Sequence, residues 1–176
     1  MKFGLASRII ERMTALDFGC STQKRNGAYG VDIDVANRPD IVFDLNKFPY
    51  PLKDSSVDRI SAHHILEHLN DLYGIFREAY RVLKQGGDFI IEVPHFSCRV
   101  AYSEPEHNRY FSYFMFDKLI ASIPCRVVKR QITFHRSFRQ IGIQWLANRF
   151  PDGFERFWIY LFPAENVKLH LKMIKS

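Results

Sequence analysis

The chain of 176 residues is 47% hydrophobic and 15% aromatic, a composition that argues against disorder or a coiled coil and fits one globular domain. Its net charge of +6 is concentrated in residues 126–176, which carry ten basic and three acidic side chains. This asymmetry favours an anionic partner, namely nucleic acid, a phosphorylated substrate or a membrane surface, with a solvated basic face as the structural alternative.

The cysteines and the lengths of the apolar runs predict where in the cell the protein is located. The three cysteines are widely separated and form no C-x-x-C pair, which predicts reduced thiols and a cytoplasmic protein. No apolar run reaches the roughly 18 residues of a spanning helix, and a signal peptide is not expected. We expect a single domain over 1–176, with a cofactor-binding half (1–94) and a half holding the substrate loop, an aromatic helical insert and the last strands (95–176).

Short strands joined by loops are predicted for the first part of the chain. In order, we expect a helix over 6–12, strands over 15–18, 29–33 and 41–43, a loop over 48–51, a turn over 54–56 and a strand over 57–62. Apolar residues at three- and four-residue steps predict a helix over 65–83, ended by the glycines of 85–87. A buried strand over 88–93 follows.

The remaining chain alternates between irregular, helical and extended segments. We expect an irregular segment over 96–112, a helix over 113–122, a strand over 126–134, a helix over 138–150, a turn over 151–153, a second aromatic helix to 162 and a strand over 166–175. The last strand alternates apolar and polar residues, which indicates burial on one face. The succession of strands and helices predicts an open, mostly parallel sheet.

Residues after the first three strands point to a nucleoside ligand. Gly19, Asp32 and Asp44 follow these strands, and ligands of parallel α/β sheets bind at the C-terminal strand ends. Two glycines of the pattern G-x-G-x-x-G are missing after the first strand, and no P-loop occurs, which argues against pyrophosphate cofactors. A nucleoside without pyrophosphate fits, because Asp32 can accept the ribose hydroxyls and Asp44 the adenine amino group.

Five motifs in order resemble class I S-adenosylmethionine-dependent methyltransferases. They are Leu16-Asp17-Phe18-Gly19-Cys20-Ser21, Gly30-Val31-Asp32, the stretch from Asp44 to Asp58, Ile65-Leu66-Glu67-His68-Leu69 and Arg81-Val82-Leu83-Lys84-Gln85-Gly86-Gly87. The resemblance implies an α/β, Rossmann-like class I methyltransferase fold with a mostly parallel seven-stranded sheet and a C-terminal antiparallel strand. It also implies S-adenosyl-L-methionine as cofactor and S-adenosyl-L-homocysteine as product.

The same resemblance implies a cofactor-binding set: Asp17, Gly19, Cys20, Ser21, Asp32, Asp44, Leu45 and His63. Gly19 would approach the methionine part, Asp17 would order that loop, and Asp32 would hold the ribose. Asp44 would bind the adenine, and His63 would lie near the sulfonium. Turn capping is the alternative role of Asp17 and Asp44.

Two departures from the family pattern concern the backbone. Ser21 replaces the second glycine, and only nine residues separate Ser21 from Val31. A crossover helix between parallel strands needs about a dozen residues, and the crossover over 34–41 is equally short. We therefore predict that the first two crossover helices are shortened or missing, which would leave the cofactor cleft more open on that side.

A metal pattern overlaps one motif. His64 to His68 spells H-x-x-E-H, the inverzincin zinc pattern, but it coincides with the methyltransferase Leu-Glu-His motif. We therefore expect no metal and no protease activity. The alternative is a divalent ion near His64, Glu67 and His68, because some ubiquinone-type O-methyltransferases resemble this stretch with an acid at that first position and bind an ion there.

The acceptor is expected to contact the irregular segment 95–112, which is dense in polar and aromatic side chains. A similar P-H-F-S…D-P-x-H-x-R-x-F-S stretch occurs in a bacterial subgroup of the family, some of it near polysaccharide genes; here Glu104 replaces the Asp. The candidate catalytic bases are His95, His107 and His64, each with a structural role as alternative. The candidate substrate-binding residues are Arg99, Tyr102 and Arg109.

These features predict methyl transfer to a small-molecule acceptor, with O-methylation of a sugar or lipid-linked glycan favoured. The basic C-terminal third leaves an RNA or protein methyltransferase as one alternative, and a non-catalytic cofactor-binding protein is another. Nucleic acid is disfavoured because no appended RNA-binding module is visible. The aromatic insert over 138–162 predicts core packing or dimer contact, so that the protein is a monomer or homodimer, with peripheral membrane contact as the alternative.

Overall fold

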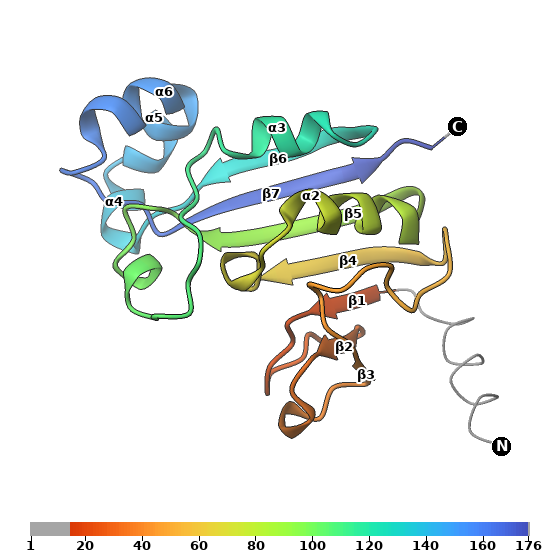
Figure 1. Cartoon of the computed structure of the whole chain (residues 1–176). Helices are drawn as coiled ribbons and strands as arrows, with labels where there is room; N and C mark the ends of the chain where they lie inside the picture. The colour runs from red at the N-terminus through yellow and green to blue at the C-terminus, as the bar shows by residue number, and fades with distance from the viewer. Residues whose placement is uncertain (1–14, 176) are drawn as a thin grey trace, which may run out of the picture.

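The computed structural model describes residues 15–175, which form a seven-stranded sheet in the order β3-β2-β1-β4-β5-β7-β6 (Figure 1). The strands are β1 (Ala15–Phe18), β2 (Tyr29–Asp32), β3 (Ile41–Val42), β4 (Val57–His63), β5 (Leu83–Pro94), β6 (Cys125–Ile132) and β7 (Asn166–Met173). β7 runs antiparallel between β5 and β6, and the pairs from β3 to β5 are parallel. The predicted class I methyltransferase sheet is confirmed.

One face of the sheet is covered by helices. α2 (Leu72–Val82) and α3 (Phe116–Ala121) pack their apolar side chains and the inward side chains of the strands into one continuous core. Within it Phe76 of α2 meets Phe89 of β5 edge to face, with ring centroids 5.4 Å apart. The predicted alternation in β7 is confirmed, because the apolar residues of its pattern are buried and the polar ones between them are not.

The opposite face of the sheet carries polar side chains that pair across strands. Glu92 of β5 accepts from His63 at 3.1 Å and from Lys168 at 2.9 Å, and His170 contacts Asp88 at 2.8 Å. Helices that usually cover this face would come from the crossovers β1–β2 and β2–β3. Those crossovers contain a single 3₁₀ turn, η1 (Val35–Asn37). The predicted loss of two crossover helices is confirmed, since the chain is too short there to form them.

The prediction of one helix over 65–83 is wrong at both ends. Residues after β4 form a 3₁₀ turn, η2 (Leu66–His68), and the backbone becomes extended at Leu69 before Asp71 caps α2 by accepting from Gly74 N. The apolar periodicity spans this break because η2 and α2 face the same core. The helix ends at Val82, and β5 begins at Leu83, so the glycines of 85–87 lie within the strand and do not stop the helix.

The insert after β6 is also more broken than predicted. The helix expected over 138–150 is divided into α4 (Arg136–Gln140) and α5 (Ile143–Arg149), because Gly142 between them has φ of +83°. The turn expected over 151–153 is α6 (Pro151–Gly153), which continues into the π-helical turn η4 (Phe154–Trp158). A second small core holds the insert on the end of β6.

Other boundaries differ less. The helix expected over 113–122 is confirmed as the shorter α3, and the predicted strands agree except that β5 starts five residues early. A further 3₁₀ turn, η3 (Arg99–Tyr102), interrupts the irregular segment. The helix expected over 6–12 lies outside the described residues. Across residues 15–175 no helix has the length and apolarity needed to cross a bilayer.

Arg81, from one of the family motifs, holds the loop between β3 and β4. Its guanidinium forms a bidentate pair with Glu78, at 2.8 and 2.7 Å, and donates to the carbonyl oxygens of Tyr50 and Leu52. Glu78 also accepts from Tyr50 N at 2.6 Å. Arg81 lowers the pKa of the Glu78 carboxyl, which keeps the pair charged at neutral pH. This motif therefore serves the scaffold, not the ligand.

Candidate functional site

The turn after β1 requires glycine at its first position. Gly19 has φ of +65°, and a Cβ there would lie 2.6 Å from the Ile65 side chain. The amides of Gly19 and Cys20 both donate to Val31 O, at 2.9 and 3.2 Å. Ser21 also has a positive φ, of 46°. The chain thus turns tightly over the end of β2, which fits the close backbone approach that a bound methionine group would need.

Two aspartates orient this turn. Asp32, at the end of β2, accepts from Ser21 N at 3.0 Å, which turns its carboxylate toward the turn after β1. Asp17 in β1 is buried and accepts from Arg25 N at 3.0 Å, with the Arg25 guanidinium 3.7 Å away. Asp17 therefore orders the β1–β2 loop, as predicted. Asp32 also accepts from Asp34 N and from the Asn37 side chain, so its orientation is set before any ligand arrives.

The residues expected to bind adenine follow β3. Asp44 accepts from Asn46 N at 2.9 Å and has Lys47 at 3.6 Å. Leu45 is buried in the main core and does not face an open cleft. Asp44 thus caps its own turn, which is the alternative role expected for it, while its partly exposed carboxylate keeps acceptor capacity on the edge where Asp32 lies.

His63, predicted to lie near the sulfonium, points to the face of the sheet opposite α2 and α3, which carries no helix among residues 15–175. There its Nδ1 contacts Glu92, and this contact, together with Lys168, lowers the pKa of Glu92 to about 2. The hollow beside it is lined by the β1–β2 loop, including Lys24 and Arg25. The next residue along the chain, His64, enters the polar cavity described below.

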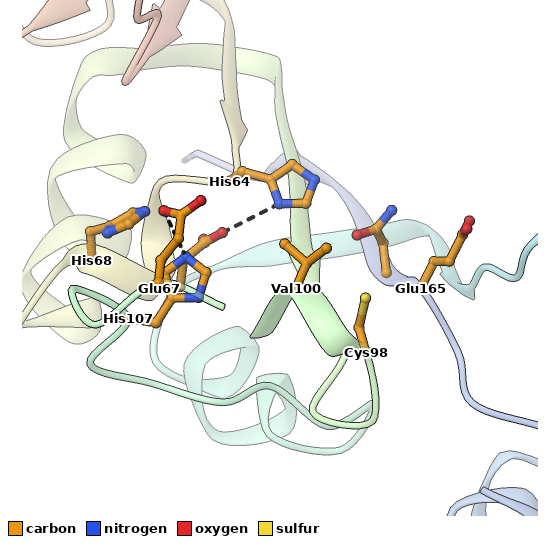
Figure 2. A pocket seen from close by; sticks show the side chains of 9 residues that line it. His64, Glu67, His68, Cys98, Val100, His107 and Glu165 are labelled. Atoms are coloured by element: carbon orange, nitrogen blue, oxygen red, sulfur yellow. Dashed lines mark ion pairs between the residues drawn. The ribbon is translucent and has the colours of Figure 1, made fainter. Parts of the chain in front are cut away.

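A polar cavity of about 480 Å³ lies beside the end of β4. Three segments line it: the turn after β4, the irregular segment 98–107 and the residues before β7. Figure 2 shows Glu67, His68 and His107 gathered at one end, with Cys98 and Glu165 at the other. Its lining residues are His64, Glu67, His68, Cys98, Val100, Glu104, His107, Glu165 and Asn166.

Glu67 is the most unusual residue of the cavity. Its side chain is 1% exposed, and neither carboxylate oxygen has a hydrogen-bond partner among residues 15–175. The nearest charged group is His64, whose Nδ1 lies 3.3 Å from Glu67 Oε1 without hydrogen-bond geometry. The Glu67 carboxylate raises the pKa of His64. The sequence placed Glu67 in the Leu-Glu-His motif and, as an alternative, beside a divalent ion with His64 and His68; the helix expected over 65–83 does not begin there.

His107 brings the irregular segment into the cavity. Its Nδ1 lies 3.0 Å from Ala101 O, so Nδ1 carries the hydrogen and Nε2 is left with its lone pair. Glu104 Oε2 is 3.5 Å from that Nε2, and the His68 ring stands edge-on to the His107 ring at 4.7 Å. One ligand atom from each of Glu67, His68 and His107 lies within 4.8 Å of the other two. These three can hold a metal ion.

Other predicted residues lie away from the cavity. The His95 ring is fully buried, and its nitrogens contact Ser97 Oγ and Glu155 Oε1, each at 2.9 Å. Placed there, it fastens the insert to β5 and has no route to an acceptor. Arg109 donates to the carbonyl oxygens of Leu69 and Asn70 and acts as a clamp.

The last two predicted substrate residues are on the surface. Arg99 is exposed, and Tyr102 is exposed and stacked on Tyr110 at 4.6 Å. Neither lines the polar cavity. Cavity residues that the sequence did not single out include Cys98, Glu165 and Asn166. His68 was named as a site residue only in the alternative metal set, through the H-x-x-E-H pattern, and no sequence signal indicates the other three.

Comparisons with known proteins agree with the fold. No curated protein matches the chain. A methyltransferase from Archaeoglobus fulgidus described as SAM dependent matches with a TM-score of 0.66 and 16% identity, covering 97% of this chain and 92% of that one. The [4+2]-cyclase SpnF matches with a TM-score of 0.63 and 15% identity, over 98% and 82% of the two chains.

A geranyl diphosphate C-methyltransferase from Streptomyces coelicolor, in complex with S-adenosyl-L-homocysteine, matches with a TM-score of 0.62 and 16% identity, over 93% and 70% of the two chains. At such low identity these structures establish the fold. The family itself is indicated by the sequence, because residues 5–91 match the model of the methyltransferase domain. The motifs, the strand order and this match, which covers just under half of the chain, are those of class I S-adenosylmethionine-dependent methyltransferases.

Proposed function

We propose that this protein methylates a hydroxyl oxygen of a small-molecule acceptor that binds in the polar cavity. One observation carries the proposal: Ile65 packs against Gly19, while its neighbours His64 and Glu67 line the cavity. The turn after β4 therefore joins the cofactor edge of the sheet to the cavity. An acceptor held there would lie beside the methionine end of a cofactor bound over Gly19.

The cofactor-binding residues follow from the strand ends. Gly19 would admit the methionine part, Asp32 would accept the ribose hydroxyls, and Asp44 would accept the adenine amino group. S-adenosyl-L-methionine supplies an electrophilic methyl group on a sulfonium cation. The protein then needs to hold the acceptor oxygen in line with that group and to take its proton, and positioning supplies most of the rate gain.

Two of the three predicted bases, His107 and His64, line the cavity. Ala101 O fixes a hydrogen on His107 Nδ1, so Nε2, which lies 3.5 Å from Glu104 Oε2, is the nitrogen that would accept a proton. His64 stands at the mouth of the cavity with 45% of its side chain exposed. A histidine near neutral pH is well matched to removing a hydroxyl proton as the new bond forms. The buried Glu67 carboxylate would stabilise the resulting imidazolium of His64.

Cofactor binding is tested by calorimetric titration with S-adenosyl-L-homocysteine. Asp32→Ala removes a charged acceptor and should weaken binding roughly 10- to 100-fold. Asp34→Ala is the matched control, because it makes the same charge change two residues away, where the carboxylate accepts from Ala36 N and from no other residue of the range 15–175. If the wild-type protein does not bind, the methyltransferase proposal fails. Equal binding by both variants would reject the role given to Asp32.

The finer proposal is a sugar or lipid-linked glycan as acceptor, reached at an anionic membrane surface. Its support is the insert, where Trp145, Phe157 and Tyr160 are 70%, 67% and 89% exposed. Arg149 and Arg156 lie over neighbouring aromatic rings, at 4.9 and 5.3 Å from their centroids. Exposed aromatics combined with arginines suit the interface of anionic lipids. The three free cysteines are consistent with the proposed cytoplasmic location.

Flotation with vesicles of phosphatidylglycerol and phosphatidylcholine tests the membrane surface. The wild-type protein should float, and the double variant Trp145→Ala/Phe157→Ala should stay at the bottom of the gradient. Val127→Ala/Val128→Ala is the matched control, since these side chains are also exposed but belong to β6. Failure of the wild-type protein to float, or its dimerisation through the insert, would reject the membrane proposal. Salt-sensitive RNA binding would favour the RNA methyltransferase alternative.

A further inference from the structure

The cavity brings together three metal-ligating side chains from two distant segments. Glu67 and His68 follow β4, whereas His107 lies about 40 residues further along, in the irregular segment. Their ligand atoms lie within 4.8 Å of one another. Glu67 and His107 are buried and His68 is partly buried. A cluster of surface acids would not have this mixture of imidazole and carboxylate, nor this degree of burial.

The strongest sign of a missing partner is the carboxylate. Both oxygens of Glu67 are buried without a hydrogen-bond donor among the described residues. A buried charge is normally paired, hydrogen-bonded or bound to a metal. The contact with His64 at 3.3 Å involves Oε1 only, so it leaves Oε2 without any partner. A cation between Glu67, His68 and His107 would satisfy the carboxylate.

His107 is oriented as a ligand would be. Its Nδ1 is directed at Ala101 O at 3.0 Å, so Nε2 is the nitrogen available for coordination, with Glu104 Oε2 3.5 Å away as a further oxygen donor. Metal-bound histidines usually have such a partner on the other ring nitrogen, often a backbone carbonyl. The side chain is 3% exposed, so the ring keeps this orientation without a ligand.

The two ligand segments are fastened to each other by their backbones. Asn108 N donates to Glu67 O at 2.8 Å, and the Asn108 side chain approaches His68 O at 3.4 Å. Arg109 donates from Nε to Leu69 O at 3.0 Å. Residues adjacent to His107 thus bind the turn that carries the other two ligands. The spacing of the cluster is therefore set by the fold before any ion binds.

We propose that Glu67, His68 and His107 form a binding site for Zn²⁺ at the end of the polar cavity where they gather. Two imidazoles and one carboxylate are a donor set that zinc accepts in sites with an open coordination position. The open position would face the cavity, where water or an acceptor hydroxyl can bind, and a zinc-bound hydroxyl loses its proton more readily. The site rests on these residues and does not depend on the proposed methyl transfer. With the ion bound to His107 Nε2, His64 would be the remaining base.

The test uses the full-length chain, stripped of metal with a chelator and dialysed. Calorimetric titration with ZnCl₂ should give one site per chain, and Co²⁺ should give the visible absorption of a low-coordinate complex. Glu67→Gln and His107→Asn, which keep side-chain size, should each weaken zinc binding at least about tenfold. His135→Asn is the matched control, because His135 lies at the start of α4, outside the cavity.

Each outcome decides between the site and its alternatives. Loss of binding in both ligand variants, with His135→Asn unchanged and all variants folded by circular dichroism, supports the site. No binding by the wild-type protein overturns it and leaves Glu67 paired with His64 alone. Binding that survives Glu67→Gln and His107→Asn also overturns it. Titration of the same samples with S-adenosyl-L-homocysteine separates this result from the methyltransferase proposal. Asp32→Ala should still bind zinc, and Glu67→Gln should still bind S-adenosyl-L-homocysteine.

Discussion

The two halves of the sheet are built differently. Strands β1 to β3 have four residues or fewer, whereas β4 to β7 have seven to twelve. The longer strands are covered by α2 and α3 and supply most of the strand residues in the main apolar core, to which β1 and β2 add Leu16, Phe18 and Val31. The shorter ones are joined by loops in which carboxylates accept backbone amides: Asp17 from Arg25, Asp32 from Ser21 and Asp40 from Gly30. The cofactor edge therefore depends on turn geometry, and overall stability depends on the long strands.

The largest effect that tests this difference is expected in the core of the long strands. Phe89 in β5 is fully buried against Phe76, so Phe89→Ala should lower the free energy of unfolding by about 3–5 kcal/mol. Val42→Ala in β3, where the side chain is 51% exposed, should change it by less than about 0.5 kcal/mol. Urea denaturation measures both, and similar losses would contradict the division of stability described above.

An intermediate effect is expected at the turn after β1. Gly19→Ala adds a Cβ at positive φ and 2.6 Å from Ile65, so it should cost about 2–3 kcal/mol and also weaken binding of S-adenosyl-L-homocysteine. Gly27→Ala is the matched control. It shares the positive φ, of +76°, but meets nothing within 4 Å, so about 1 kcal/mol is expected. Equal losses in stability would show that Ile65 does not constrain the turn.

The smallest effect concerns the polar face of the long strands. His63 and then Lys168 lower the pKa of Glu92 to about 2, from a usual value of 4.5. A depressed carboxyl pKa stabilises the fold above the unfolded pKa, and this contribution is lost as pH falls from about 5 toward 2. Because Glu92 is partly exposed to solvent, Glu92→Gln should lower the free energy of unfolding by about 1–2 kcal/mol at pH 7. The free energy of unfolding should also fall less steeply in this variant as the pH is lowered.

Urea titrations at pH 7, 5 and 3 measure the Glu92→Gln effect, with Glu106→Gln, at an exposed position, as the control. If stability falls equally with decreasing pH in Glu92→Gln and in the wild-type protein, the ion pairs of the polar face add nothing to stability. The two faces of the sheet would then differ only in their exposure to water.

Local chemistry explains which predictions succeeded. Gly19 after β1, Asp17 in β1, Asp32 at the end of β2 and Asp44 after β3 act on residues close in sequence, so local motifs were enough to locate this edge of the sheet. The loss of two crossover helices followed from chain length, since nine residues cannot leave and re-enter a parallel sheet through a helix. The alternation in β7 is read directly from the period of a strand.

Non-local contacts explain which predictions failed. Periodicity could not separate η2 from α2, because both turn their apolar residues to one core although the backbone breaks at Leu69. His95 and Arg109 have the residue types of an active site. Their partners, Glu155 and the carbonyl oxygens of Leu69 and Asn70, are far away in sequence. No spacing rule indicates that these side chains are already occupied.

The sequence by itself indicated a methyltransferase-like fold, the loss of two crossover helices and the edge on which a nucleoside cofactor is expected, because short-range turns, chain length and strand periods encode them. The tertiary structure alone decided which histidines face a cavity, which are buried, and that Glu67, His68 and His107 meet. The physical reason is that hydrogen bonds between segments about 40 residues apart bring those side chains together. Contacts over such a distance produce no periodic pattern in the sequence.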